Sequence, residues 1–190
     1  SEYLIYTDSL VGNNNKLIGH FLHGLKLKSY EFKRYKSKKD TRLITINVFG
    51  KKNAVSNKDQ IKFKALEEGT FYARDLVSEP GNILHPDEYA KRLKTFKKFG
   101  LKVTIFDQKK LKKLGMHALL GVGQGSVRGS YLVTLEWNGA KNNSKPLAFV
   151  GKGVCFDTGG YSLKPARFME DMTYDMAGSA AVVGLMKNLA

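Results

Sequence analysis

Residues 147–160 read LAFVGKGVCFDTGG, an apolar run that passes directly into a glycine-rich segment with one lysine and one aspartate. We expect residues 147–150 to form a buried strand, because a short apolar run bounded by glycine is typical of a strand inside a sheet. The polar groups that follow would then emerge at the carboxyl end of that strand, where open α/β sheets bind ligands. The stretch therefore predicts an α/β fold with a site at the edge of its sheet.

The rest of the chain alternates strand-like and helix-like segments around this stretch. Its β-branched residues predict a strand at 42–49, and its polar composition predicts a turn or loop at 11–15. Apolar spacing predicts a helix that starts at the capping-box-like pair Ser56 and Asp59 and ends at 78–82. We also expect helices at 85–99, 107–114 and 176–190, and strands at 101–106 and 131–137. This order of segments indicates an α/β layer with helices over a sheet.

The chain has 190 residues, of which 42% are hydrophobic and 11% aromatic. Such a composition can bury a core, which excludes disordered, collagen-like and disulfide-rich classes. The single cysteine, Cys155, cannot form an internal disulfide and fits a reducing cytoplasm. No apolar run reaches the roughly 18 residues of a membrane span, and the first residues lack the pattern of a signal peptide. We therefore expect a soluble, cytoplasmic protein with no membrane partner. A chain that begins with Ser1 and ends inside a predicted helix is interpreted as an internal fragment.

The formal net charge of +15 is spread unevenly along the chain. Residues 1–145 carry 28 basic and 13 acidic side chains, whereas residues 146–190 carry four of each. Most of the excess is lysine at amphipathic spacing, as in residues 91–98 and 109–113, which is typical of solvated helix faces. No zinc-finger, RNA-recognition or basic-zipper pattern is present, so nucleic acid is not an expected partner. A basic non-catalytic module that binds nucleic acid or another polyanion stays open as an alternative function, and a purely structural α/β fragment as a third.

The charged residues among the glycines do not match a nucleotide site. A P-loop needs Lys and then Ser or Thr directly after the second of two glycines five apart, and neither residues 151–153 nor residues 121–125 supply that spacing. The dinucleotide fingerprint fails too, because Ser126 stands where its last glycine is required. Two lysines and two aspartates in this half still need partners: Lys152, Asp157, Lys164 and Asp175. They either pair with one another or hold hard cations with a substrate between them.

Three motifs in a fixed order carry a resemblance to a known family. They are ARDLVSEPGN at 73–82, GKGVCFDTGGYSLKP at 151–165 and MEDMTYDMAGSAAV at 169–182. Together they resemble the leucyl aminopeptidase family, also called cytosol aminopeptidases, and the resemblance is strong from about residue 72 to residue 190. It implies a metal-dependent aminopeptidase that releases N-terminal amino acids from peptides, with a leucine-type preference, by attack of metal-activated water.

The resemblance also implies an architecture and partners. Residues 1–56 would be the end of a small α/β N-terminal domain, residues 57–82 a linking helix and turn, and residues 83–190 the first half of an α/β/α sandwich catalytic domain. The family implies two divalent metal ions, zinc or manganese, peptide substrates with a free N-terminus, and a homo-hexamer for the full-length protein. The family's second motif, with an asparagine, an aspartate, a glutamate and an arginine, is absent before Ala190. We therefore expect these 190 residues alone to be inactive and to bind metal weakly.

Site roles follow from the resemblance residue by residue. Lys152 and Asp157 match metal ligands, and Asp175 matches a second carboxylate ligand that also accepts a hydrogen bond from the substrate's amine. Lys164 matches the catalytic lysine, and Met172 matches a position that lines the pocket for the substrate's first side chain. These residue types suit the chemistry, since Asp157 has two oxygens to bridge two ions and Lys152 can ligate only as a neutral amine. Lys164 would stay cationic and stabilise a developing oxyanion.

Each of these residues also has a plain structural interpretation. Asp157 could cap the turn formed by the residues after it, and Asp175 could cap the helix that starts near Met176. Lys152 and Lys164 could simply be solvated. Met172 could be a core residue, which is the more common use of methionine.

The cysteine and two histidines suggest packing rather than chemistry. Cys155 stands where the family has a hydroxyl residue, and we interpret it as a small buried thiol. His20 and His23 have a spacing found in some zinc sites, but they lie in an apolar run without a further ligand pair. We therefore expect both histidines to be packed side chains.

Overall fold

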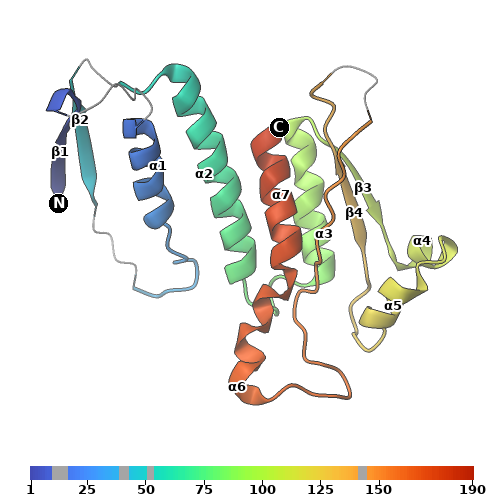
Figure 1. The fold of residues 1–190 in the computed structure, drawn as a ribbon. Coiled ribbons are helices and arrows are strands. Elements are labelled where there is room, and N and C mark those ends of the chain that lie inside the picture. Colours follow the sequence, from blue (N-terminus) through green and yellow to red (C-terminus); the bar gives the residue numbers. More distant parts are fainter. Residues whose placement is uncertain (10–16, 39–42, 51–53, 141–144) are drawn as a thin grey trace. The chain divides into compact units, whose positions relative to one another are not determined.

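Figure 1 shows the computed structural model of the chain, which describes residues 1–9, 17–38, 43–50, 54–140 and 145–190. The chain divides into two compact units, Ser1–Glu67 and Glu68–Ala190. Helix α2 (Asn57–Ser78) contributes residues to both, so the division falls inside the segment predicted to link two domains. The turn predicted at 11–15 lies outside the described residues.

The first unit contains a pair of parallel strands. Its elements before α2 are β1 (Glu2–Tyr6), the 3-10 helix η1 (Thr7–Ser9), α1 (Leu17–Lys28) and β2 (Thr45–Phe49). Strands β1 and β2 pair in parallel, and the Thr7 hydroxyl donates to the Phe49 carbonyl at 2.9 Å where the two strands end. The strand predicted at 42–49 is confirmed over the residues of β2, and residue 42 lies outside the described part of the chain.

Helix α2 begins as the sequence predicts. The Asp59 backbone N–H donates to Ser56 Oγ at 3.1 Å, and the same Oγ donates to Asp59 Oδ2 at 2.8 Å. This contact satisfies one of the N–H groups that the first turn of a helix leaves without an intrahelical partner. The capping prediction is therefore confirmed.

The two histidines of α1 pack against one phenylalanine of α2. The ring centroids of His20 and Phe63 are 5.1 Å apart, and those of His23 and Phe63 are 4.8 Å apart. His23 Nδ1 also lies 3.0 Å from Glu67 Oε1. The prediction of packed side chains is confirmed for His23, whose side chain is 17% exposed, whereas His20 contacts Phe63 but is itself exposed.

The second unit combines one antiparallel strand pair with helices. Its elements after α2 are α3 (Pro86–Lys94), η2 (Thr95–Phe99), β3 (Lys102–Phe106), α4 (Gln108–Lys113), α5 (His117–Gly123), β4 (Leu132–Glu136), α6 (Ala166–Met169), η3 (Glu170–Met176) and α7 (Ala177–Leu189). Strand β3 pairs with β4 in antiparallel register. The helices and strands predicted between residues 85 and 137 and the final helix are confirmed to within a few residues, and so is the α/β class. Elements α5, α6 and η3 were not predicted.

Local sequence signals mark the start of helix α3 and the end of the 3-10 helix that continues it. His85 is its N-cap and accepts a hydrogen bond from the Glu88 backbone N–H at 3.4 Å, and Pro86 follows at the first helical position. The helix passes into η2, which ends at Gly100 with a left-handed φ of 83°. The predicted helix over 85–99 is thus one α-helix continued by a 3-10 turn.

The prediction of a buried strand at residues 147–150 is wrong. These residues form no strand, and Leu147, Phe149 and Val150 are 86%, 53% and 96% exposed. A strand must exchange backbone hydrogen bonds with a neighbour. Within the described ranges, β3 and β4 pair only with each other, and no strand pairs with residues 147–150. An apolar run is therefore not sufficient to form a strand when no neighbouring strand pairs with it.

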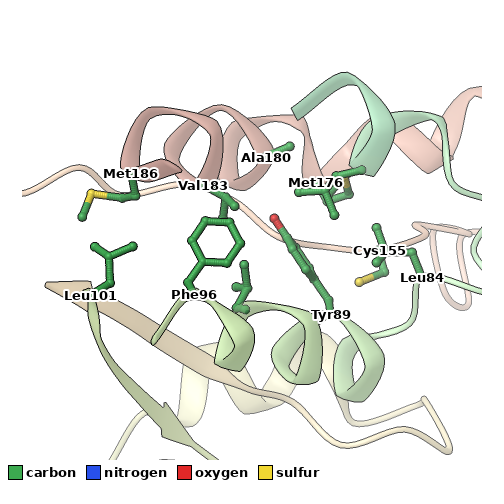
Figure 2. Close-up of a cluster of buried hydrophobic side chains, with 11 residues drawn as sticks. Leu84, Tyr89, Phe96, Leu101, Cys155, Met176, Ala180, Val183 and Met186 are labelled. Carbon is green, nitrogen blue, oxygen red and sulfur yellow. The ribbon is translucent and has the colours of Figure 1, made fainter. Parts of the chain in front are cut away.

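The core of the second unit lies between α2, α3 and α7. Figure 2 shows the side chains of Tyr89 on α3 and Phe96 on η2 pointing toward α7, and Phe96 is 1% exposed. The cluster is completed by Met176 at the end of η3 and by Ala180, Val183 and Met186 on one stripe of α7, all buried. Burial of a large apolar side chain stabilises a fold by roughly 2 kcal/mol. No helix among the described residues combines the length and apolar content needed to span a membrane.

A buried ion pair holds the turn between α2 and α3. The Glu79 side chain is fully buried, and its Oε1 lies 3.1 Å from Arg92 Nη1. Arg92 Nε also donates to Glu88 Oε1 at 3.0 Å. Because a buried carboxylate requires a charged or hydrogen-bonding partner, this network fixes the chain at the point where it leaves α2.

Helices α2 and α7 approach each other through a pair of glycines. A Cβ atom added at Gly69 would lie 2.5 Å from the Gly184 carbonyl oxygen, and a Cβ added at Gly184 would lie 2.5 Å from the Gly69 carbonyl oxygen. Both contacts are with backbone atoms, which cannot rotate away. The close crossing of the two helices therefore requires glycine at both positions.

We predict that Gly184→Ala destabilises the protein by about 2 kcal/mol, because the new methyl group overpacks the helix crossing. The matched control is Gly121→Ala in α5, where nothing lies within 4 Å of the added Cβ. The control should change stability by less than about 1 kcal/mol and in the stabilising direction, since alanine favours helix over glycine. Urea unfolding measures both. Equal effects of the two substitutions would contradict the crossing described here.

Candidate functional site

The glycine-rich segment forms a tight loop in which Lys164 contacts Asp157 and Thr158. Asp157 Oδ1 accepts a hydrogen bond from the Gly159 N–H at 2.8 Å, and Gly159 adopts a left-handed φ of 90°. The Lys164 N–H donates to the Thr158 carbonyl at 3.0 Å and closes the loop. The loop thus brings Lys164 back beside Asp157, and Asp157 does cap the turn that follows it.

The first charged pair joins the two ends of this loop. Lys164 Nζ lies 2.9 Å from Asp157 Oδ2 and 2.8 Å from the sulfur of Met172. Met172 lies in η3, so the pair also connects the loop with the segment that leads into α7. The structure therefore places Asp157, Lys164 and Met172 in direct contact.

The second charged pair joins the glycine-rich segment to η3. Lys152 Nζ lies 2.9 Å from Asp175 Oδ1, and the Lys152 side chain is 62% exposed while that of Asp175 is 17% exposed. The other carboxylate oxygen, Asp175 Oδ2, is buried and has no hydrogen-bond partner. A buried acceptor without a partner is costly, so this oxygen is suited to a cation.

The first pair lowers the pKa of Asp157, the second raises the pKa of Lys152, and the two pairs interact. A hydrogen bond from Lys164 is the main cause that lowers the pKa of Asp157, followed by the Gly159 N–H, and the charges of Lys164 and Lys152 lower it further. The hydrogen bond to Asp175 raises the pKa of Lys152, and the charge of Asp157 adds to that effect. Lys152 is therefore an ammonium ion in this arrangement. Ligation of a metal by Lys152 would release its proton.

Cys155 lies in the same segment but is not part of the charged site. It is 8% exposed, and burial raises the pKa of its thiol to about 11. Its thiol donates to the Gly153 carbonyl at 3.8 Å. The prediction of a small buried thiol is confirmed, because a reactive cysteine needs a lowered pKa and exposure.

The residues present fit hard divalent cations in part. The carboxylates of Asp157 and Asp175, the second with a buried oxygen that lacks a partner, are the oxygen donors that such ions prefer. Within the ranges that the structure covers, however, no three His, Cys, Asp or Glu side chains come together as a metal cluster. The described residues could therefore supply some ligands of a metal site but not a complete shell.

The comparison with known protein families agrees with this geometry. The model of the family described as "Cytosol aminopeptidase family, catalytic domain" matches residues 71–190, which contain both charged pairs. The chain belongs to the cytosol aminopeptidase family. The resemblance read from the three motifs is thereby confirmed.

Curated relatives and solved structures of this family cover nearly the whole chain. A probable cytosol aminopeptidase of Chelativorans sp. (strain BNC1) is 51% identical over 174 residues, which are 88% of this chain and 35% of that protein. Another, of Phytoplasma australiense, is 44% identical over 193 residues, which are 100% of this chain and 39% of that protein. The chain thus spans a little over a third of the length of these cytosol aminopeptidase relatives.

Two solved structures share the fold of the chain. The cytosol aminopeptidase from Coxiella burnetii aligns with a TM-score of 0.80 at 27% identity and covers 98% of this chain and 38% of its own. The bottromycin maturation enzyme BotP, in complex with Mn, aligns with a TM-score of 0.80 at 28% identity over 99% of this chain and 40% of its own. The bound Mn is a property of that structure.

Two residues of the site were missed by the sequence analysis. The Ser179 N–H donates to the Lys152 carbonyl at 2.9 Å, and the Tyr89 hydroxyl is 3.1 Å from Ser179 Oγ. A tyrosine on the apolar face of a predicted helix was a usable signal, because a buried hydroxyl requires a partner. The identity of the partner was not available, since the two residues are 90 positions apart.

We predict that Lys164→Met raises the pKa of Asp157 toward its ordinary value in the metal-free protein. The reason is that the hydrogen bond from Lys164 is the main cause that lowers this pKa. A carboxyl group with a lowered pKa stabilises the fold at pH values above its ordinary, unfolded-state pKa. This contribution is lost as the pH falls through the folded-state pKa. A side-chain NMR titration of Asp157 measures the shift, with Lys97→Met on the exposed side of η2 as control. An unchanged Asp157 pKa in the Lys164 variant would show that the pair is not formed in solution.

Proposed function

We propose that the protein is a metal-dependent aminopeptidase that releases N-terminal amino acids from peptides, with a preference for leucine-type residues. The observation that carries the proposal is the Lys152 and Asp175 pair, in which one buried carboxylate oxygen has no partner, within a segment that matches the cytosol aminopeptidase family. The relatives are named for aminopeptidase activity, and one structural neighbour holds Mn. Activity belongs to the full-length protein, since the chain spans a little over a third of the length of its relatives.

Lys152, Asp157 and Asp175 would hold two divalent ions, zinc or manganese, together with ligands from outside these 190 residues. Bound ions would lower the pKa of water and stabilise negative charge on a carbonyl oxygen. Asp157 suits a bridging position because its two oxygens already have two separate donors, the Gly159 N–H and Lys164 Nζ. Asp175 suits a terminal position because its Oδ2 has no partner.

The lysines would act differently from each other. Lys152 is largely exposed, so its ammonium group can leave Asp175, lose its proton and donate a lone pair. Lys164 must leave Asp157 and stay protonated in order to face the scissile carbonyl oxygen and stabilise the charge that develops there. Both carboxylates are therefore occupied by ammonium groups that cation binding would replace.

Two residues would recognise the peptide. Asp175 would accept a hydrogen bond from the free α-amine of the substrate, which restricts cleavage to the first residue. Met172 would line the pocket for the first side chain, and its contact with Lys164 places that pocket next to the catalytic group. A flexible thioether suits an aliphatic side chain such as leucine.

We propose a cytoplasmic location, supported by the names of the relatives and by the presence of one buried cysteine. A homo-hexamer is proposed for the full-length protein on the family resemblance alone. These two proposals do not affect the chemistry of the site.

We predict that the full-length protein loaded with Mn²⁺ or Zn²⁺ hydrolyses leucine amide, and that Asp157→Ala and Lys164→Ala abolish this activity in different ways. Asp157→Ala should lower the bound metal, because it removes a ligand of both ions. Lys164→Ala should retain the metal and lose about 100-fold or more in kcat, because a cationic group acts on the transition state. Metal content by elemental analysis and turnover measure the two effects.

The matched control is Lys109→Ala, an exposed lysine of α4 outside the site, which should leave metal content and turnover unchanged. Loaded wild-type protein that cleaves no unblocked aminoacyl amide would overturn the proposed function. Equal loss of metal in the Asp157 and Lys164 variants would overturn the assignment of Lys164.

A further inference from the structure

We propose that the first turn of α7 positions the ligands of the metal site. Ser179 and Tyr89 would hold Lys152 beside Asp175. Gly151 would allow the glycine-rich segment to approach the first turn of α7. The inference rests on the proposed function, because it concerns residues that would hold the ions. None of the three residues would touch an ion or substrate, so they are positioning residues.

The start of α7 is capped by a distant part of the chain. A helix leaves its first N–H groups without intrahelical partners, and the N-cap residue Met176 makes no side-chain cap hydrogen bond. The Ser179 N–H instead donates to the Lys152 carbonyl at 2.9 Å. The backbone of Lys152 is therefore held at the first turn of the helix that directly follows Asp175.

The Ser179 hydroxyl extends this connection to a third element. Ser179 Oγ donates to the Met176 carbonyl at 2.8 Å and lies 3.1 Å from the Tyr89 hydroxyl. A serine hydroxyl has one proton, and it is used on Met176, so Tyr89 must donate to Ser179 Oγ. Tyr89 lies on α3 and is 6% exposed, so its hydroxyl is fixed inside the core. The residue next to Asp175 is thus tied to α3 through two hydrogen bonds.

Gly151 is the residue at which the two segments are closest. A Cβ added there would lie 2.5 Å from Ser179 Cα and 2.6 Å from both the Gly178 carbonyl oxygen and the Ser179 nitrogen. All three are backbone atoms, so any side chain at position 151 would push the segment away from α7. A Cβ at the neighbouring Gly153 would meet only the Ser179 side chain, at 3.2 Å from Oγ and 3.5 Å from Cβ. The two glycines therefore form a matched pair for an experiment.

Displacement of this contact would separate the two candidate ligands. Lys152 and Asp175 come from segments 23 positions apart in sequence, and the Ser179 contact with Lys152 is their backbone link. Metal ligands must be held to within about half an ångström of their productive geometry. Loss of the link should therefore weaken metal binding even where the fold survives.

The test combines two readouts on the full-length protein. Hydrogen exchange of the Ser179 amide, followed by NMR without metal, reports the cap directly. Titration with Mn²⁺ reports the affinity of the site. Gly151→Ala should speed Ser179 exchange and raise the Kd for Mn²⁺ about tenfold or more, whereas Gly153→Ala should raise it no more than about threefold. Equal affinities of the two variants would overturn the proposal.

A second pair of variants separates positioning from stability and applies even if Gly151→Ala fails to fold. Tyr89→Phe removes one hydroxyl and should raise the Kd for Mn²⁺ about threefold. Leu93→Ala removes a buried side chain from the same helix and should lower the melting temperature of the metal-free protein further, with no change in the Kd. The proposal would be overturned if the affinity for Mn²⁺ fell in proportion to the melting temperature in both variants. It would also be overturned if Tyr89→Phe left the Kd for Mn²⁺ unchanged. A wild-type protein that binds no Mn²⁺ would overturn the proposed function instead, while Ser179 exchange would still test the cap.

Discussion

Helix α7 is the element on which both the core and the candidate site depend. Its buried residues Ala180, Val183 and Met186 pack in one cluster with Tyr89 and Leu93 of α3, and Gly184 allows it to cross α2 at close range. In its first turn the Ser179 N–H donates to the Lys152 carbonyl, and the helix begins two residues after Asp175. The position of the charged residues is therefore set by apolar packing, which is stronger and less sensitive to salt than the ion pairs it supports.

The positive charges of the two lysines balance the negative charges of the two aspartates, but one carboxylate oxygen has no hydrogen-bond partner. Each aspartate has one ammonium group at 2.9 Å, and the pKa of Asp157 is lowered while that of Lys152 is raised. Asp175 Oδ2 has no partner, so the site has an oxygen ready for a cation but retains a balanced charge without one. Such a site would exchange ammonium groups for divalent ions, and the protons and positive charge released would make metal binding dependent on pH.

Local sequence signals predicted much of this fold, and tertiary partners account for the rest. Ser56 with Asp59, and Pro86 after His85, marked helix starts that the structure contains, because capping is a contact between near neighbours. The apolar run at 147–150 predicted a strand that is not there, because strand formation depends on a neighbour that the run itself does not specify. The sequence left open whether the lysines and aspartates pair or bind cations. It could not indicate which lysine meets which aspartate, nor that Tyr89 reaches Ser179 across 90 positions.

The proposed function requires Asp175 and Asp157 to exchange their lysine partners for divalent cations. The most direct measurement is a crystal structure of the full-length protein grown with Mn²⁺, with anomalous scattering recorded at the manganese edge. The account predicts an anomalous peak within bonding distance of Asp175 Oδ2, with Lys152 Nζ moved away from Asp175 Oδ1 and Lys164 Nζ away from Asp157 Oδ2. Both pairs intact at 2.9 Å, with no anomalous density beside either aspartate, would contradict it.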